Sequence, residues 1–84
     1  MRQCQDINFS TAAFRQLQSI RMEHGNEAGE LYWAILACLK GELECPMRRV
    51  RHGRIRIHVG PYRAIINERE NGCDVLRIYR AAST

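Results

Sequence analysis

The sequence predicts a single α+β domain over residues 1–84, with a two-helix hairpin packed on one face of a small, mostly antiparallel four-stranded sheet (order β-α-α-β-β-β). Three observations predict this fold class. Residues 54–59 alternate strictly between basic and apolar side chains, as in a strand with one buried face. Residues 11–40 instead carry apolar side chains at helical spacing. Asn71-Gly72 lies between two alternating segments, where a hairpin turn is expected.

The N-terminal segment is predicted to form a short strand and then a helix. Asp6–Phe9 alternates polar and apolar residues, which indicates a strand. Ser10 or Thr11 is expected to cap the following helix by accepting a hydrogen bond from an unpaired backbone N–H, and Gly25 is expected to end the helix. Its predicted apolar stripe consists of Ala13, Phe14, Leu17 and Ile20.

A second helix is predicted to begin after Asn26, whose side chain is expected to cap it. Glu27 and Glu30 lie in its first turn, where negative charge favours a helix. Lys40 and Gly41 are expected to end the helix. The wide apolar face suits packing on both the sheet and the first helix: Ala28, Leu31, Tyr32, Ile35, Leu36, Cys38 and Leu39. Trp33 lies off this face and is interpreted as a rim residue of the helix pair.

Three further strands are predicted at Arg54–Val59, Tyr62–Glu68 and Asp74–Arg80. The alternation in the first of these directs its apolar side chains, Ile55, Ile57 and Val59, into the core. Its polar side chains then form a row on the opposite face of the sheet: Arg54, Arg56 and His58.

Positive charge is concentrated in the C-terminal half of the chain. Residues 1–47 carry four basic and six acidic side chains, a balance of −2, whereas residues 48–84 carry nine basic and three acidic ones, a balance of +6. Twelve of the thirteen cations are arginine, whose planar group binds phosphate or carboxylate through two hydrogen bonds. A solvated sheet face would also be basic, but the dense, strand-phased run favours binding of a polyanion or an acidic partner.

The cysteines and the terminal segments indicate the cytoplasm. Cys4, Cys38, Cys45 and Cys73 show no CxxC or zinc-site spacing, so we expect free thiols in a reducing compartment and no metal site. No apolar stretch approaches the ~20 residues of a membrane span. No apolar segment follows the first residues, so no signal peptide and no membrane partner are expected.

Residues 56–65, Arg-Ile-His-Val-Gly-Pro-Tyr-Arg-Ala-Ile, resemble the pattern Arg-[Leu/Ile]-x-Val-Gly-x-Tyr-Arg-[Val/Ile]-[Ile/Val] of the RelE/ParE superfamily of bacterial toxins from type II toxin–antitoxin modules. Leu76-Arg77-Ile78 is similar to the last strand of that family, and the order of elements matches over nearly the whole chain. The resemblance implies one of two activities. RelE-type members are metal-free, ribosome-dependent mRNA endoribonucleases, and ParE-type members inhibit DNA gyrase. Both are silenced by a small antitoxin.

The resemblance also implies roles for individual residues. The basic strand residues of RelE-type toxins correspond to Arg54 and Arg56, and their catalytic arginine corresponds to Arg63. RelE-type toxins continue with an Arg or His and a Tyr that assist proton transfer, whereas residues 80–84 here read Arg-Ala-Ala-Ser-Thr. A ParE-type gyrase inhibitor, or a non-toxic nucleic-acid- or protein-binding module of the same fold, therefore stays open as an alternative.

Metal-free RNA cleavage needs a base, an acid and positive charge at the phosphorane. We assign catalysis to Arg63, His58 and Arg56, because arginine supplies charge and neighbouring cations keep the imidazole neutral, as a base requires. A solvent-exposed strand position for His58 is an equally good interpretation. A salt bridge from Arg63 to Glu68 or Glu70 is the structural alternative at that position.

Nucleic-acid binding is assigned to five residues that continue this basic surface: Arg54, Arg56, Arg51, Arg80 and Tyr79. Tyr79 could donate a proton or stack on a base, whereas Tyr62 is expected to pack under the sheet. No cofactor is expected. The expected partners are an acidic antitoxin, held across the same face, and the ribosome with its mRNA or DNA gyrase.

Overall fold

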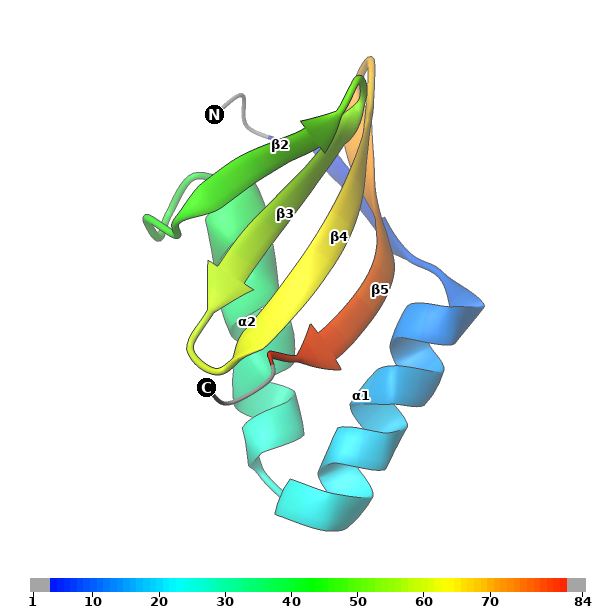
Figure 1. The fold of residues 1–84 in the computed structure, drawn as a ribbon, viewed down its shortest axis with the longest axis vertical. Coiled ribbons are helices and arrows are strands. Elements are labelled where there is room, and N and C mark those ends of the chain that lie inside the picture. Colours follow the sequence, from blue (N-terminus) through cyan, green and yellow to red (C-terminus); the bar gives the residue numbers. More distant parts are fainter. Residues whose placement is uncertain (1–3, 82–84) are drawn as a thin grey trace.

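The computed structural model describes residues 4–81, which form two helices and five strands (Figure 1). In chain order they are β1 (Asp6–Phe9), α1 (Thr11–His24), α2 (Glu27–Leu39), β2 (Met47–Arg51), β3 (Arg54–Val59), β4 (Tyr62–Arg69) and β5 (Gly72–Arg80). The two helices form an antiparallel hairpin on one side of the sheet, and the other face of the sheet is open (Figure 1). The α+β class and the helical hairpin agree with the prediction.

The sheet is mixed and has five strands in the order β1-β5-β4-β3-β2. β1 pairs with β5 in parallel, and all other pairs are antiparallel. The prediction of four strands is therefore wrong, because it omits β2. All five residues of β2 are exposed, so this edge strand has no buried face and its sequence, Met-Arg-Arg-Val-Arg, shows no polar–apolar alternation.

The core lies between the helices and the sheet and includes the apolar row of β3. Ile55 and Ile57 are 2% and 0% exposed, and Val59 is half-buried against the core. The alternating residues of β3, Arg54 and Arg56, are half-buried on the open face. The predicted orientation of β3 is thus confirmed.

The helix boundaries follow from local capping, with one exception. The Ser10 hydroxyl accepts a hydrogen bond from the Ala13 N–H at 3.0 Å and donates one to the Leu76 carbonyl at 2.8 Å, which fixes the start of α1 against β5. Gly25 ends α1 with a φ of 61°, a conformation that glycine adopts without strain. Asn26 does not cap α2 with its side chain, because its backbone is itself helical.

Gly72 begins β5, whereas the sequence predicts this residue in the turn before the strand. A Cβ atom at this position would collide with the carbonyl oxygen of Asp6, its register partner on β1. The parallel strand β1 therefore approaches β5 closely because residue 72 has no side chain. The turn itself is formed by Glu70 and Asn71.

All four cysteines form disulfides, so the prediction of free thiols is wrong. Cys4 pairs with Cys73 and Cys38 with Cys45, each with a Cα–Cα distance of 5.9 Å. Such distances suit a disulfide, but the pairs are separated by 69 and 7 residues, so no short motif in the sequence marks them. In the described part of the chain, neither helix is long and apolar enough to cross a membrane.

Candidate nucleic-acid interface

Three predicted site residues form one row across the open face of the sheet. His58 of β3 is the register partner of Arg63 on β4, and Arg63 is the partner of Tyr79 on β5. Directly opposed residues in antiparallel strands have Cβ atoms about 4.5–5.5 Å apart. The three side chains, an imidazole, a guanidinium and a phenol, are therefore neighbours, although 21 positions separate the first from the last in the sequence.

A second row lies beside the first and consists mainly of arginines. Arg56 on β3 is opposed by Arg48 on β2 and by Ile65 on β4, and Ile65 is opposed by Arg77 on β5. The ion pairs between residues 4 and 81 leave Arg48, Arg56 and Arg77 without an acidic partner. Counting Arg63, the two rows thus hold four arginines without compensating carboxylates, and three of them, Arg48, Arg56 and Arg63, act electrostatically on His58.

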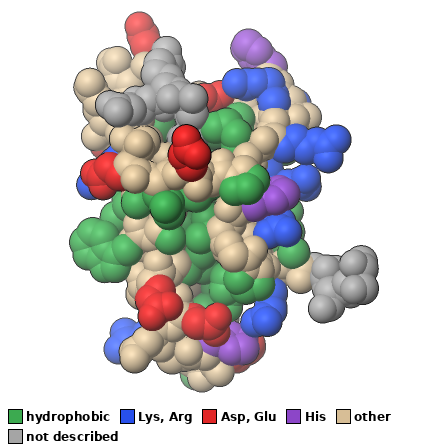
Figure 2. All heavy atoms as spheres, turned by 90° about the vertical axis from the view of Figure 1, so that its left-hand side faces the viewer, with side chains coloured by type: hydrophobic (Ala, Val, Ile, Leu, Met, Phe, Trp, Pro, Cys, Tyr) green, Lys and Arg blue, Asp and Glu red, His purple; other side chains and the backbone are tan. Residues whose placement is uncertain are grey.

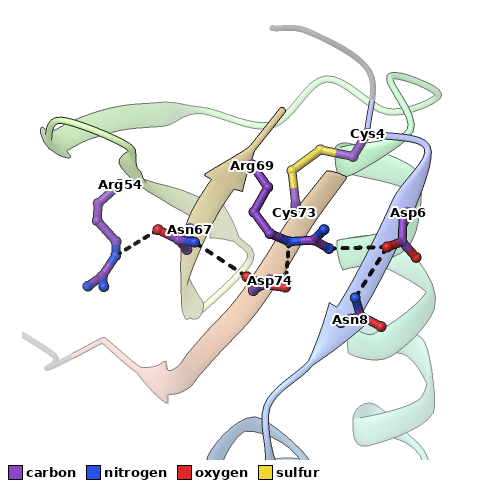
Figure 3. A network of polar contacts seen from close by, with 8 residues as sticks. All are labelled: Cys4, Asp6, Asn8, Arg54, Asn67, Arg69, Cys73 and Asp74. Carbon is purple, nitrogen blue, oxygen red and sulfur yellow. Dashed lines mark hydrogen bonds and ion pairs between the residues drawn. A yellow bond between two sulfur atoms is a disulfide. The ribbon is translucent and has the colours of Figure 1, made fainter. Parts of the chain in front are cut away.

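The opposite end of the open face is electrically balanced by a polar network (Figure 3). Arg69 contacts Asp74 at 3.0 Å and Asp6 at 3.3 Å. Asn67 accepts a hydrogen bond from Arg54 at 3.2 Å and donates one to Asp74 at 3.3 Å. Two cations and two carboxylates make this network neutral as a whole. The open face therefore has a neutral end and a cationic end.

The charge distribution is visible on the molecular surface (Figure 2). Lys and Arg side chains gather along the right-hand side of this view, where the open face of the sheet lies, and most acidic side chains lie elsewhere. Near the edge of the sheet, Arg49 on β2 forms an ion pair with Glu68 at 3.2 Å. The cationic end defined by Arg48, Arg56, Arg63 and Arg77 is thus the largest uncompensated charge on the sheet.

The environment of His58 favours its neutral form. Desolvation lowers the pKa of His58 below its usual value of 6.5, and the positive charges of Arg63, Arg56 and Arg48 lower this pKa further. The predicted effect of neighbouring cations is confirmed, although desolvation is the larger cause. The Nε2 atom of His58 is shielded from solvent and has no hydrogen-bond partner among the described residues. Such an orphan atom is unusual and marks a place where a ligand or an ordered water completes the hydrogen bonding.

Arg63 is held by the corner between β3 and β4. Its Nη1 donates hydrogen bonds to the carbonyls of Gly60 at 3.1 Å and Tyr62 at 2.9 Å. The alternative of a salt bridge from Arg63 to Glu68 or Glu70 is not observed among the described residues, and Glu68 contacts Arg49 instead. Both described hydrogen bonds of Arg63 use Nη1, so Nε and Nη2 can donate to a ligand. Like Nε2 of His58, the Nε atom of Arg56 is buried and has no hydrogen-bond partner in the described part of the chain.

The remaining predicted residues are placed differently from the row of His58, Arg63 and Tyr79. Arg54 belongs to the neutral network, and Arg51 is exposed beside it at the end of β2. Arg80 alternates with Tyr79 and points to the helix side, where its guanidinium lies 5.8 Å from the centre of the Tyr62 ring. Tyr79 is 40% exposed and can contact a ligand.

Sequence reasoning missed Arg48 and Arg77 as members of the cationic end. Arg48 lies on the strand that was not predicted. Arg77 follows a bulge, because Ile65 pairs with Arg77 while Ile66 pairs with Val75, and Leu76 is the extra residue. This bulge changes the phase of β5 and hides which of its side chains share a face.

Two aromatic predictions concern the other side of the sheet. Tyr62 is 4% exposed and packs under the sheet, as predicted. Trp33 is 67% exposed and makes an edge contact with Tyr32 at 5.5 Å between ring centres, which agrees with a rim position. No three His, Cys, Asp or Glu side chains gather as a metal site within residues 4–81.

The comparisons with known proteins show the fold. No family model and no curated protein sequence matches the chain. Among solved structures, YafQ in the DinJ–YafQ complex of E. coli superimposes with a TM-score of 0.69 at 13% identity, covering 89% of this chain and 91% of that one. RelE in the RelB–RelE antitoxin–toxin complex of Methanococcus jannaschii gives 0.62 at 18% identity, covering 87% and 88%. YoeB in the YoeB–YefM complex of Staphylococcus aureus gives 0.66 at 10% identity, covering 98% and 100%. The chain therefore shares the fold of YafQ, RelE and YoeB, in agreement with the fold that the sequence resemblance implies.

Proposed function

We propose that this protein is the toxin of a bacterial type II toxin–antitoxin module and acts, like RelE, as a metal-free, ribosome-dependent mRNA endoribonuclease. The row of His58, Arg63 and Tyr79 carries this proposal. A gyrase inhibitor does not require a base, a cation and a phenol on adjacent strands, whereas transesterification of RNA uses one of each. The fold shared with YafQ, RelE and YoeB is consistent with the proposal.

Each member of the row has one step in the reaction. Neutral His58 takes the proton from the 2′-hydroxyl of the nucleotide, and the 2′-oxygen attacks the adjacent phosphorus. Arg63 donates hydrogen bonds from Nε and Nη2 to the developing phosphorane, and Arg56 adds positive charge beside it. Tyr79 donates its proton to the leaving 5′-oxygen. The P–O5′ bond breaks, and the products are a 2′,3′-cyclic phosphate and a free 5′-hydroxyl.

The low pKa of His58 supports its role as the base. A base must be unprotonated before it can accept the 2′-hydroxyl proton, and desolvation with nearby cations keeps His58 neutral near pH 7. The phenol of Tyr79 has an O–H that it can donate, and it takes the role of the acid.

The partner is an acidic antitoxin, and the working compartment is the cytoplasm, where translating ribosomes are present. The toxins YafQ, RelE and YoeB were each solved in a complex with a second protein, which for RelE is the antitoxin RelB. An acidic segment complements the cationic end of the open face. Changing both Arg48 and Arg56 to Glu should therefore abolish co-purification with the antitoxin.

Primer extension on a translated message tests the proposal. Wild-type expression should produce new mRNA 5′ ends, and Arg63→Ala and His58→Ala should each reduce the cuts on the order of 10²–10³-fold. Arg80→Ala is the matched control, because Arg80 points to the opposite side of β5. The absence of cuts from wild-type protein in actively translating cells would refute the nuclease and favour gyrase inhibition. Cuts that persist in Arg63→Ala would remove that residue from the mechanism.

A further inference from the structure

The loop between α2 and β2 connects one disulfide directly to the cationic end of the sheet. Cys38 lies in the last turn of α2, and Cys45 lies two residues before β2 begins. The carbonyl of Pro46, the next residue, accepts a hydrogen bond from the backbone N–H of His58 at 2.9 Å. Cys45, which the disulfide ties to α2, thus directly precedes the residue whose carbonyl binds the backbone N–H of His58.

Few other contacts fix this part of the loop. Glu42 and Leu43 donate backbone hydrogen bonds to the carbonyl of Ala37, at 2.9 and 3.2 Å. Within residues 44–46, the bond from His58 to Pro46 is the only hydrogen bond that the described structure contains. The following strand, β2, is fully exposed and pairs on one side only, with β3. The disulfide is therefore the main restraint on residues 44–46, which lead directly into β2 and its Arg48.

The disulfide is also accessible to a small reductant. A hollow of about 670 Å³ opens over it and is lined by Cys38, Gly41, Leu43, Glu44, Cys45, Pro46 and Met47. Cys38 is 1% exposed, whereas Cys45 is half-buried. An attacking thiolate thus reaches the sulfur of Cys45 more readily than that of Cys38.

We propose that the Cys38–Cys45 disulfide is a redox-sensitive clamp that holds Arg48 and His58 in place on the cationic end. The regulatory meaning of the clamp rests on the proposed function, whereas the coupling itself does not. The oxidised protein has the ordered site. The reduced protein loosens residues 44–46, frees the N–H of His58 and lets the start of β2 separate from β3.

The chemistry is a two-electron thiol–disulfide exchange with a dithiol. A thiolate of the dithiol attacks the sulfur of Cys45, an S–S bond forms between them, and the Cys38–Cys45 bond breaks. Cys38 leaves as a thiolate and takes a proton. The second thiol of the reductant then closes its own disulfide and releases Cys45 as a thiol. A disulfide oxidant such as oxidised glutathione reverses both steps.

Hydrogen exchange of the His58 amide, measured by NMR, tests the clamp without any enzymatic activity. In the oxidised wild type this amide should be protected, and dithiothreitol should accelerate its exchange at least about tenfold. The double variant Cys38→Ser/Cys45→Ser should show the fast rate without reductant. The matched control Cys4→Ser/Cys73→Ser keeps the clamp and should show the slow rate until dithiothreitol is added.

The amide of Ile66 in the central strand β4 serves as the internal reference and reports whether a variant is folded. Equal exchange rates of the His58 amide in the oxidised and reduced proteins, with Ile66 protected in both, would overturn the clamp. Cleavage of mRNA by the two redox forms is measured separately. If neither form cleaves, the proposed nuclease fails, and the exchange data still decide on the clamp. If the reduced form cleaves as fast as the oxidised form, its regulatory role fails.

Discussion

If the protein binds RNA as proposed, the salt dependence of binding should distinguish the cationic end of the open face from its neutral end. Seven arginines lie on this face: Arg48, Arg51, Arg54, Arg56, Arg63, Arg69 and Arg77. Two of them, Arg54 and Arg69, belong to the network that Asp6 and Asp74 neutralise. Arg51 lies beside this network, at the end of β2. We therefore expect the four arginines of the cationic end, rather than all seven, to displace counterions from phosphates.

The expected slope follows from this count. On single-stranded nucleic acid, log K falls with log[salt] by about 0.7 for each phosphate neutralised, so four contacts give a slope of about −2.8. Between 50 and 200 mM salt, the affinity should then fall about 50-fold. If all seven arginines contacted phosphates, the slope would be about −4.9 and the loss about 900-fold.

Fluorescence anisotropy with a labelled single-stranded RNA measures this slope, and 2′-O-methyl substitution prevents cleavage during the titration. Arg56→Gln should reduce the magnitude of the slope by about 0.7. The matched change on the same strand, Arg54→Gln, should leave the slope unchanged. A wild-type slope of −4 or steeper, or equal effects of the two variants, would refute the division of the face into a neutral and a cationic end.

Two further predictions concern stability, each measured by urea denaturation. Gly72→Ala should lower the free energy of unfolding by about 1–3 kcal/mol, because the new Cβ collides with the Asp6 carbonyl. Gly29→Ala should raise the free energy of unfolding by about 0.5–1 kcal/mol, because this helical position has open space around it. If Gly72→Ala were instead the more stable of the two variants, the close packing of β1 on β5 would be refuted. Lowering the pH from 7 to 5 should destabilise wild type more than His58→Gln. The unfolded chain binds a proton on this imidazole near pH 6.5, whereas the folded-state pKa is lower, so stability is lost as pH falls. Equal losses in both proteins would contradict the lowered pKa.

The sequence predicts best those elements that have one buried face. In β3 every second side chain enters the core, so the alternation of Ile55 and Ile57 with cations indicates both the strand and its orientation. The helices follow from the same physical cause, with Ser10 and Gly25 as their local signals. The edge strand β2 lacks this signal because both of its faces are exposed, and Arg48 was missed with it.

Features that depend on contacts between distant residues could not be predicted from the sequence. The pairing of Cys4 with Cys73 requires β1 to lie beside β5 in parallel, and no local pattern specifies this pairing. The bulge at Leu76 likewise shifts Arg77 onto the open face. Simple alternation would place Arg77 on the core side, together with Val75. Neither propensity nor periodicity contains this information, because tertiary packing decides it.

The position of carboxylates, rather than the density of cations, determines where this face can bind a polyanion. Counting charge by halves of the chain assigns Asp6 to the acidic half and gives residues 48–84 an uncompensated excess of +6. In the fold, Asp6 lies 3.3 Å from Arg69, because β1 is the edge strand beside β5. This network also includes Arg54, which donates a hydrogen bond to Asn67. Arg54 is the first residue of the basic strand, and from the sequence alone it would be assigned to phosphate binding. The positive potential is thereby left at the other end of the sheet, around His58 and Arg63. A local excess of arginine in the sequence therefore locates a nucleic-acid site only after the topology shows which carboxylates share the surface.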